Sequence, residues 1–112
     1  MSLEIEFFYD PCNKCGESRQ SDFSWNYTYN CADMWRLACP GDKKMIEIDY
    51  MLCADAAKKL QAAIDAMIAE PDNYRKLNPS NGYGNYDSFL LALVLLKEAC
   101  EKEPDAVVET YR

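Results

Sequence analysis

The chain has 112 residues, of which 49% are hydrophobic and 28% charged, so its length and composition indicate a folded chain with one core and exclude intrinsic disorder. Its formal net charge of −7 is spread over both halves and opposes direct binding to nucleic acid or to an anionic membrane surface. The absence of histidine excludes imidazole-based hydrolases and any metal site that needs histidine.

The first third of the chain predicts one strand and one short helix. Residues 4–9 alternate charged and apolar side chains and then become aromatic, which is typical of a strand with one buried face. Residues 12–30 are polar and aromatic without a helical period, so we expect an irregular segment there. A short helix follows over residues 32–38, with Asn30 as its expected N-cap.

The middle of the chain predicts a long amphipathic helix. Residues 45–49 alternate and are read either as a short strand or as the entry to that helix. Residues 52–70 then form the helix, because apolar positions recur at steps of three and four: Cys53, Ala56, Leu60, Ile64 and Met67. Pro71 ends it, and Asp72 is expected to cap a single helical turn over residues 73–76.

The last third predicts a loop, a second long helix and a strand. Residues 77–85 form the loop, in which Gly82 and Gly84 are expected to supply positive φ angles. The helix over residues 86–103 is apolar on almost every side, so it must lie centrally or in an oligomer interface. Residues 106–111 have the β-branched and aromatic character of a terminal strand.

These elements together predict an α+β fold within a single domain, residues 1–112. Neither terminal strand is stable alone, so we expect the two to pair in a small antiparallel sheet. The two long helices and the short helix would then pack on that sheet. No export signal precedes the first strand, and the longest apolar run, residues 89–96, is far shorter than the ~20 residues that span a membrane. We therefore expect a cytoplasmic protein.

The six cysteines fall into two kinds. Cys53 and Cys100 continue the apolar stripes of the long helices, so they are expected in the core. Two thiols three residues apart resemble half of a zinc knuckle, which predicts a zinc site with these ligands: Cys12, Cys15, Cys31 and Cys39. The spacing of the second pair does not fit a knuckle. A surface thiol pair, or a disulfide formed on oxidation in air, are the alternatives for the first pair.

Asparagine and tyrosine are concentrated in two segments, each just ahead of a helix. Such mixtures suit recognition surfaces, and they equally suit the edge of a small core, where asparagine stabilises turns. We expect the two segments, residues 26–30 and 78–85, to meet in space and to form one patch. Its candidate binding residues are Asn26, Tyr27, Asn30, Asn81 and Tyr83.

At these residues the chain resembles a group of small proteins common in phages and prophages of Gram-positive bacteria. The shared motifs are an Asn-Tyr-Thr-x-Asn segment with Met and Trp shortly after, and a later Asn-Pro-x-Asn-Gly-x-Gly-x-Tyr segment. Here they are Asn26-Tyr27-Thr28, Asn30, Met34-Trp35, Asn78-Pro79 and Asn81-Gly82-Tyr83-Gly84-Asn85-Tyr86. The resemblance implies an origin in a mobile genetic element and no particular reaction. The Cys12 to Cys15 segment is not part of the shared pattern.

Three functions remain open on the sequence alone. The first is a non-enzymatic accessory or interaction protein, because no complete set of catalytic residues stands out. The second is a zinc-binding module, and the third is an acidic inhibitor that occupies the basic face of a nucleic-acid-binding protein. The expected partner is a protein, and homo-oligomerisation stays open because of the apolar helix over residues 86–103.

Overall fold

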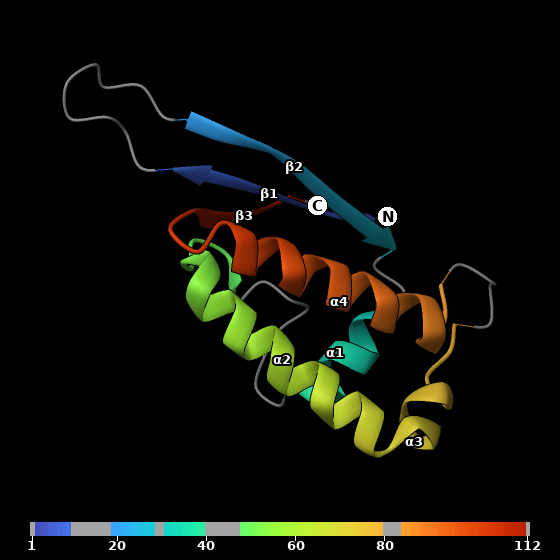
Figure 1. Ribbon diagram of the computed structural model, residues 1–112. Coiled ribbons are helices and arrows are strands. Elements are labelled where there is room, and N and C mark those ends of the chain that lie inside the picture. The colour runs from blue at the N-terminus through green and yellow to red at the C-terminus, as the bar shows by residue number, and fades with distance from the viewer. Residues whose placement is uncertain (1, 10–18, 29–30, 40–47, 80–83, 112) are drawn as a thin grey trace.

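The structure is a computed structural model that describes residues 2–9, 19–28, 31–39, 48–79 and 84–111 (Figure 1). In these residues three strands and four helices follow one another along the chain. Their bounds are β1 Ser2–Tyr9, β2 Arg19–Thr28, α1 Ala32–Ala38, α2 Cys53–Ala69, α3 Pro71–Arg75, α4 Tyr86–Lys102 and β3 Val107–Tyr111.

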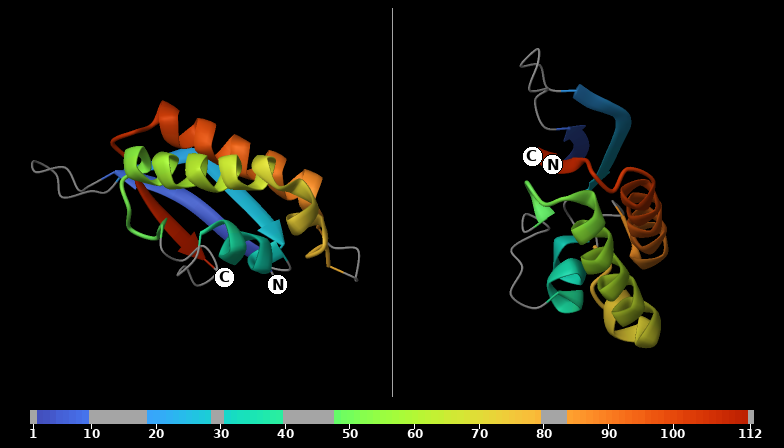
Figure 2. Two further views of the ribbon diagram at one scale, coloured as in Figure 1. Left: turned by 90° about the horizontal axis from the view of Figure 1, so that it is seen from below. Right: turned by 60° about the vertical axis from the view of Figure 1, so that its left-hand side comes forward.

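The three strands form an antiparallel sheet in the order β2-β1-β3, with all the described helices on one face (Figures 1 and 2). The first and last strands of the chain therefore pair, and the predicted α+β fold is confirmed. In the helical layer α4 lies against β2, and α2 lies against β3 and α4. None of the described helices has both the length and the apolar character needed to cross a membrane.

Strand β2 corrects the sequence prediction for its part of the chain. We expected irregular structure over residues 12–30, but Arg19–Thr28 form a ten-residue strand beside β1. Residues 12–18 lie outside the described part. The pairing is regular from Ser2↔Thr28 to Glu6↔Ser24, and the register shifts between Glu6 and Phe8. Between these pairs β2 has two more residues than β1, an irregularity of the β-bulge type, and such irregularities bend and twist a strand locally.

Both long helices and the short helix α1 occur where the sequence predicts them. The N-cap of α1 is Cys31, not the expected Asn30, and it makes no side-chain cap bond. Helix α3 begins two residues earlier than predicted, because Pro71 occupies its first position and Glu70 is the N-cap. Asp72 therefore lies inside the first turn and does not cap it.

The segment before α2 covers the outer edge of β3. Ile48 to Tyr50 form a turn, not the strand or helix entry expected, while residues 45–47 lie outside the described part. The Tyr50 N–H donates to the carbonyl of Val108 at 2.7 Å, and the Val108 N–H donates to the carbonyl of Met51 at 2.9 Å. The outward backbone N–H and C=O of Val108 in β3 are thus satisfied.

Tyr50 adopts a left-handed backbone conformation, with φ of 62°, although its side chain is 70% exposed. A residue with a Cβ atom is strained there by about 1–2 kcal/mol, whereas glycine is not. We expect Tyr50→Gly to raise the free energy of unfolding by about 0.5–1 kcal/mol, after the greater chain entropy of glycine is subtracted. Thermal unfolding would show this as a melting temperature a few degrees higher. Tyr50→Ala retains the strain, so a gain in that control would contradict the explanation.

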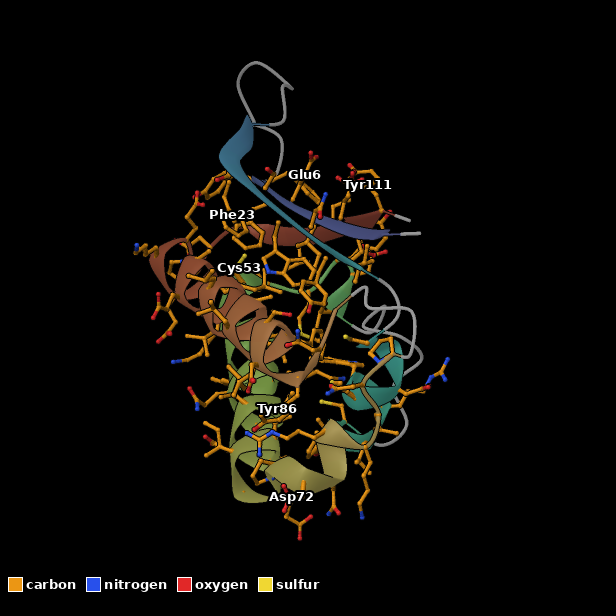
Figure 3. The ribbon with its side chains drawn as sticks, turned by 90° about the vertical axis from the view of Figure 1, so that its right-hand side faces the viewer. Glu6, Phe23, Cys53, Asp72, Tyr86 and Tyr111 are labelled. Carbon is orange, nitrogen blue, oxygen red and sulfur yellow. The ribbon has the colours of Figure 1, made fainter. Side chains whose placement is uncertain are left out.

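The core lies between the sheet and the helices. Alternate residues of β1 are fully buried, and the buried stripes of α2 and α4 face them. Cys53 and Cys100 are both 0% exposed within this core, as predicted. Figure 3 shows Cys53 beneath the sheet and Glu6 on the opposite face.

Candidate functional site

A groove of about 600 Å³ runs between the edge strand β2 and helix α4. Ten residues line it: Phe23, Ser24, Trp25, Asn26, Ala92, Leu95, Glu98, Ala99, Lys102 and Glu103. Its volume is in the range of ordinary ligand sites, about 300–1,000 Å³. Because it is bounded by a strand edge and by a helix, this groove offers backbone groups on one side and side chains on the other.

One wall of the groove is an edge strand. Among the described residues β2 has a neighbouring strand, β1, on one side only. Trp25 is buried against the helices and Phe23 is half-buried, while Ser24 and Asn26, which alternate with them, are exposed on the open face of the sheet. Figure 3 shows Phe23 on the helical side. Alternate backbone N–H and C=O groups of such a strand point outward, where another chain can pair with them.

The other wall is a largely apolar stripe of α4. Ala92, Leu95 and Ala99 recur at helical spacing along it. Leu95 is 52% exposed and its neighbour Leu91, one turn earlier, is 59% exposed. The sequence predicted that a helix this apolar lies centrally or in an oligomer interface. One face of α4 packs in the core, but the face that carries Leu91 and Leu95 is not covered by the described part of the chain. Leu95 lines the groove and Leu91 does not, but together they expose apolar surface on α4 next to it, and exposed apolar surface of this kind often marks a docking site.

Aromatic side chains fasten the N-terminal half of α4 to β2. The indole N–H of Trp25 donates to the backbone carbonyl of Ala92 at 2.8 Å. Two residues on, the Tyr27 hydroxyl hydrogen-bonds with the Ser88 hydroxyl, and it accepts a longer bond of 3.4 Å from the backbone N–H of Asn85. Burial raises the pKa of Tyr27, so its hydroxyl stays protonated at neutral pH.

Glu103 attaches the C-terminal end of α4 to the sheet, at the other end of the groove. Its carboxylate follows the last turn of α4 and accepts a hydrogen bond from the Tyr9 hydroxyl at 2.8 Å and another from the Ser21 hydroxyl at 2.6 Å. Tyr9 belongs to β1 and Ser21 to β2. Both ends of α4 are thus hydrogen-bonded to the sheet, and the groove lies between these two attachments.

The open face of the sheet, opposite the helices, is acidic next to the groove. Glu4 lies directly across from Asn26, and Glu6 lies directly across from Ser24. Glu6 also faces Glu109 across the β1–β3 pair. The hydroxyl of Tyr111 donates to Glu109, and this bond, with slight burial and the charges of Glu109 and Glu6, raises the pKa of Tyr111 to about 12. Glu6 and Tyr111 lie together on this face in Figure 3.

The four-cysteine zinc site predicted from the sequence is not supported. Cys12 and Cys15 lie outside the described residues. Cys31 and Cys39 flank the two ends of the seven-residue helix α1, so the eight residue steps between them separate their Cα atoms by about 12 Å. Two thiolate sulfurs bound to one zinc ion, each about 2.3 Å from it, are at most about 4.6 Å apart. The two short cysteine side chains cannot close a Cα separation of about 12 Å to that distance. In the described ranges no three Cys, Asp or Glu side chains form a group that could hold a metal ion.

The described cysteines differ in their expected reactivity, because the thiolate is the nucleophile. Burial raises the pKa of the Cys31 thiol, and a hydrogen bond with Cys53, together with burial, raises that of Cys100. Cys39 is only half-buried. In native protein near pH 8 we expect iodoacetamide to modify Cys39 well before Cys31, Cys53 or Cys100, as read by peptide mass mapping. Equal labelling of Cys39 and Cys100 before unfolding would contradict this core placement.

The expected meeting of the two asparagine-rich segments is confirmed where both are described. Tyr27 in β2 contacts Asn85, which precedes α4. Asn26 is exposed beside the groove. Asn30, Asn81 and Tyr83 lie outside the described residues, so their binding role stays a prediction.

The motif residues behind the phage resemblance serve the fold where they are described. Met34 and Trp35 are 0% exposed. Asn85 caps α4 by accepting from the Ser88 N–H at 3.0 Å, and the Asn78 side chain accepts from the Tyr86 N–H at 2.8 Å. The hydroxyl of Tyr86 donates to the carbonyl of Met67 in α2. These residues fix the start of α4, and through it the position of the groove.

Sequence reasoning missed the groove because it missed β2. Comparison of the chain with models of protein families, with curated proteins and with solved structures gave no significant match. The argument for function therefore depends on the geometry of the groove.

Proposed function

We propose that this chain is a non-enzymatic accessory protein that acts by binding another protein through the groove between β2 and α4. The observation that carries the proposal is the combination of an edge strand with the exposed Leu91 and Leu95 of α4. The polar side chains near the groove support the non-enzymatic part of the proposal. Tyr27, Ser21 and Glu103 form hydrogen bonds that hold α4 on the sheet, so they have a structural role. A cytoplasmic location and an origin in a phage or prophage belong to the same proposal.

The test is capture of a partner from the native host by the tagged protein and by two variants. Leu95→Asp places a charge in the groove. Ile68→Asp places the same charge on α2, where Ile68 is 58% exposed and does not line the groove. We expect the wild-type protein and Ile68→Asp to retain one partner in a defined stoichiometry, and Leu95→Asp to lose it. Equal capture by all three proteins, or capture by none, would contradict the proposal.

A second candidate is an inhibitor that occupies the basic face of a nucleic-acid-binding protein. It is favoured by Glu4, Glu6 and Glu109, which line up across the open face of the sheet. Such binding would weaken strongly between low and high salt, because exposed charges are screened over about 10 Å at 0.1 M salt. A complex that is unchanged in high salt would rule this candidate out.

A further inference from the structure

We propose that the groove takes an extended segment of the partner, in which apolar residues alternate with lysine or arginine, and that this segment pairs with β2 as a fourth strand. The inference rests on the proposed function and names the chemistry of the partner. Three features of the structure carry it: the backbone edge of β2, the apolar face of α4 and the acidic open face of the sheet.

The outer backbone edge of β2 would form main-chain hydrogen bonds with the added strand. Over Ser24 to Thr28 the register with β1 is regular, and the bulge begins only beyond Ser24. This stretch therefore forms a regular ladder with β1, and among the described strands β1 occupies only one of its two edges. Strand addition at such an edge is a common mode of peptide recognition, with affinity from main-chain hydrogen bonds and specificity from pockets for alternate side chains.

The groove determines which residue types are favoured at every second position of the added strand. Successive residues of a strand point to opposite faces of the sheet, so one set would point toward the helices, as Trp25 does. There it meets Ala92, Leu95 and Ala99 of α4. Burying apolar side chains against this stripe would also cover the exposed Leu95. Apolar residues are therefore favoured at these alternate positions.

The remaining side chains of the added strand would lie on the open face of the sheet, opposite the helices. These side chains would stand beside Ser24 and Asn26, whose cross-strand neighbours are Glu6 and Glu4. The added strand would lie two strand spacings, about 10 Å, from the strand that carries those carboxylates. A long lysine or arginine side chain can extend over part of that distance and bring its charge closer to them. The chain as a whole carries −7. Lysine and arginine are therefore favoured at the positions between the apolar ones.

Charge also selects between this occupant and a second copy of the chain. In a dimer formed by β2 against β2, the Glu4 and Glu6 rows of both copies would share one continuous open face. Three strand spacings, about 14 Å, separate the two rows, and each copy adds a net charge of −7, so the repulsion between two like-charged chains disfavours this dimer. A basic partner segment replaces that repulsion with attraction.

The test is binding of fluorescent peptides to the full chain, measured by anisotropy. One library holds peptides of about six residues in which Lys or Arg alternates with Val, Ile or Leu, and a second library holds the same compositions in scrambled order. We expect the best alternating peptide to bind at least about tenfold more tightly than its scrambled form. N-methylation at every second residue should abolish binding in one frame and preserve it in the other, because only one frame faces β2.

Variants of the protein complete the test. Leu95→Asp, and Glu4→Lys combined with Glu6→Lys, should each weaken the alternating peptide by about tenfold or more. Their matched controls, Ile68→Asp and Asp105→Lys, change exposed residues outside the groove and should leave binding unchanged. No alternating preference, equal loss in both N-methyl frames, or a protein dimer that dissociates with Leu95→Asp would overturn the inference. If a host partner still depends on Leu95 while no alternating peptide binds, the proposed function stands and strand pairing is wrong.

Discussion

Trp25→Ala is expected to lower the free energy of unfolding by about 3–5 kcal/mol, as large-to-small changes of buried aromatic residues do. Trp25 is 7% exposed, and its indole N–H donates to the backbone of Ala92 in α4. The change removes apolar burial, a hydrogen bond and the contact that positions β2 against α4. Since a domain is stable by only about 5–15 kcal/mol, urea unfolding should show a much lower midpoint.

Trp25→Phe separates the contribution of the buried ring from the contribution of the hydrogen bond to Ala92. It retains an aromatic side chain in the core but has no N–H for Ala92, so we expect a smaller loss in which the hydrogen bond contributes about 1 kcal/mol. If Trp25→Ala were as stable as Trp25→Phe, the ring would not be holding β2 on the helix, and the described wall of the groove would be wrong.

Glu103→Ala is expected to destabilise the fold by about 2–4 kcal/mol, because hydrogen bonds to a charged group contribute about 1.5–3 kcal/mol each. Its carboxylate accepts from both Tyr9 and Ser21 and is half-buried. Without it, the end of α4 separates from β1 and β2. Thermal unfolding measures the loss, and a double-mutant cycle with Ser21→Ala measures the share of one bond.

Glu101→Ala is the matched control for this change. Glu101 lies two residues away, on the last turns of the same helix, and forms an ion pair with Lys97 at 3.0 Å. Exposed pairs of this type contribute at most about 1 kcal/mol. A loss as large for Glu101→Ala as for Glu103→Ala would show that the effect comes from charge near the end of α4 and not from the bonds to the sheet.

Much of the fold could be predicted because periodicity reports burial. Helix α2 shows the three-and-four spacing of one buried stripe, and its bounds, Cys53–Ala69, lie within one residue of those predicted. Strand β2 was missed although it carries a signal of its own. Phe23, Trp25 and Tyr27 alternate with polar residues, which is the period of two of a strand with one buried face. The absence of a helical period does not by itself distinguish an irregular segment from a strand.

The groove could be predicted only in part. The excess of apolar residues in α4 indicated apolar surface beyond the stripe that faces the core, and Leu91 and Leu95 are exposed there. What the sequence does not contain is which strand lies beside it. Pairing of β1 with both β2 and β3 leaves β2 at an edge, and only the order of the strands shows this. The helix between Cys31 and Cys39 was predicted from the sequence, and the structure shows that it separates these two proposed zinc ligands.

The central claim is that β2 and α4 together bind a partner protein, and amide hydrogen exchange of the free and partner-bound chain tests it most directly. We expect slower exchange in the complex at Ser24 to Tyr27, whose edge the partner would cover, and protection of the α4 segment around Leu95. The outer face of α2 around the exposed Ile68 should be unchanged. Protection confined to α2, or a complex in which exchange at β2 is unaltered, would contradict the claim.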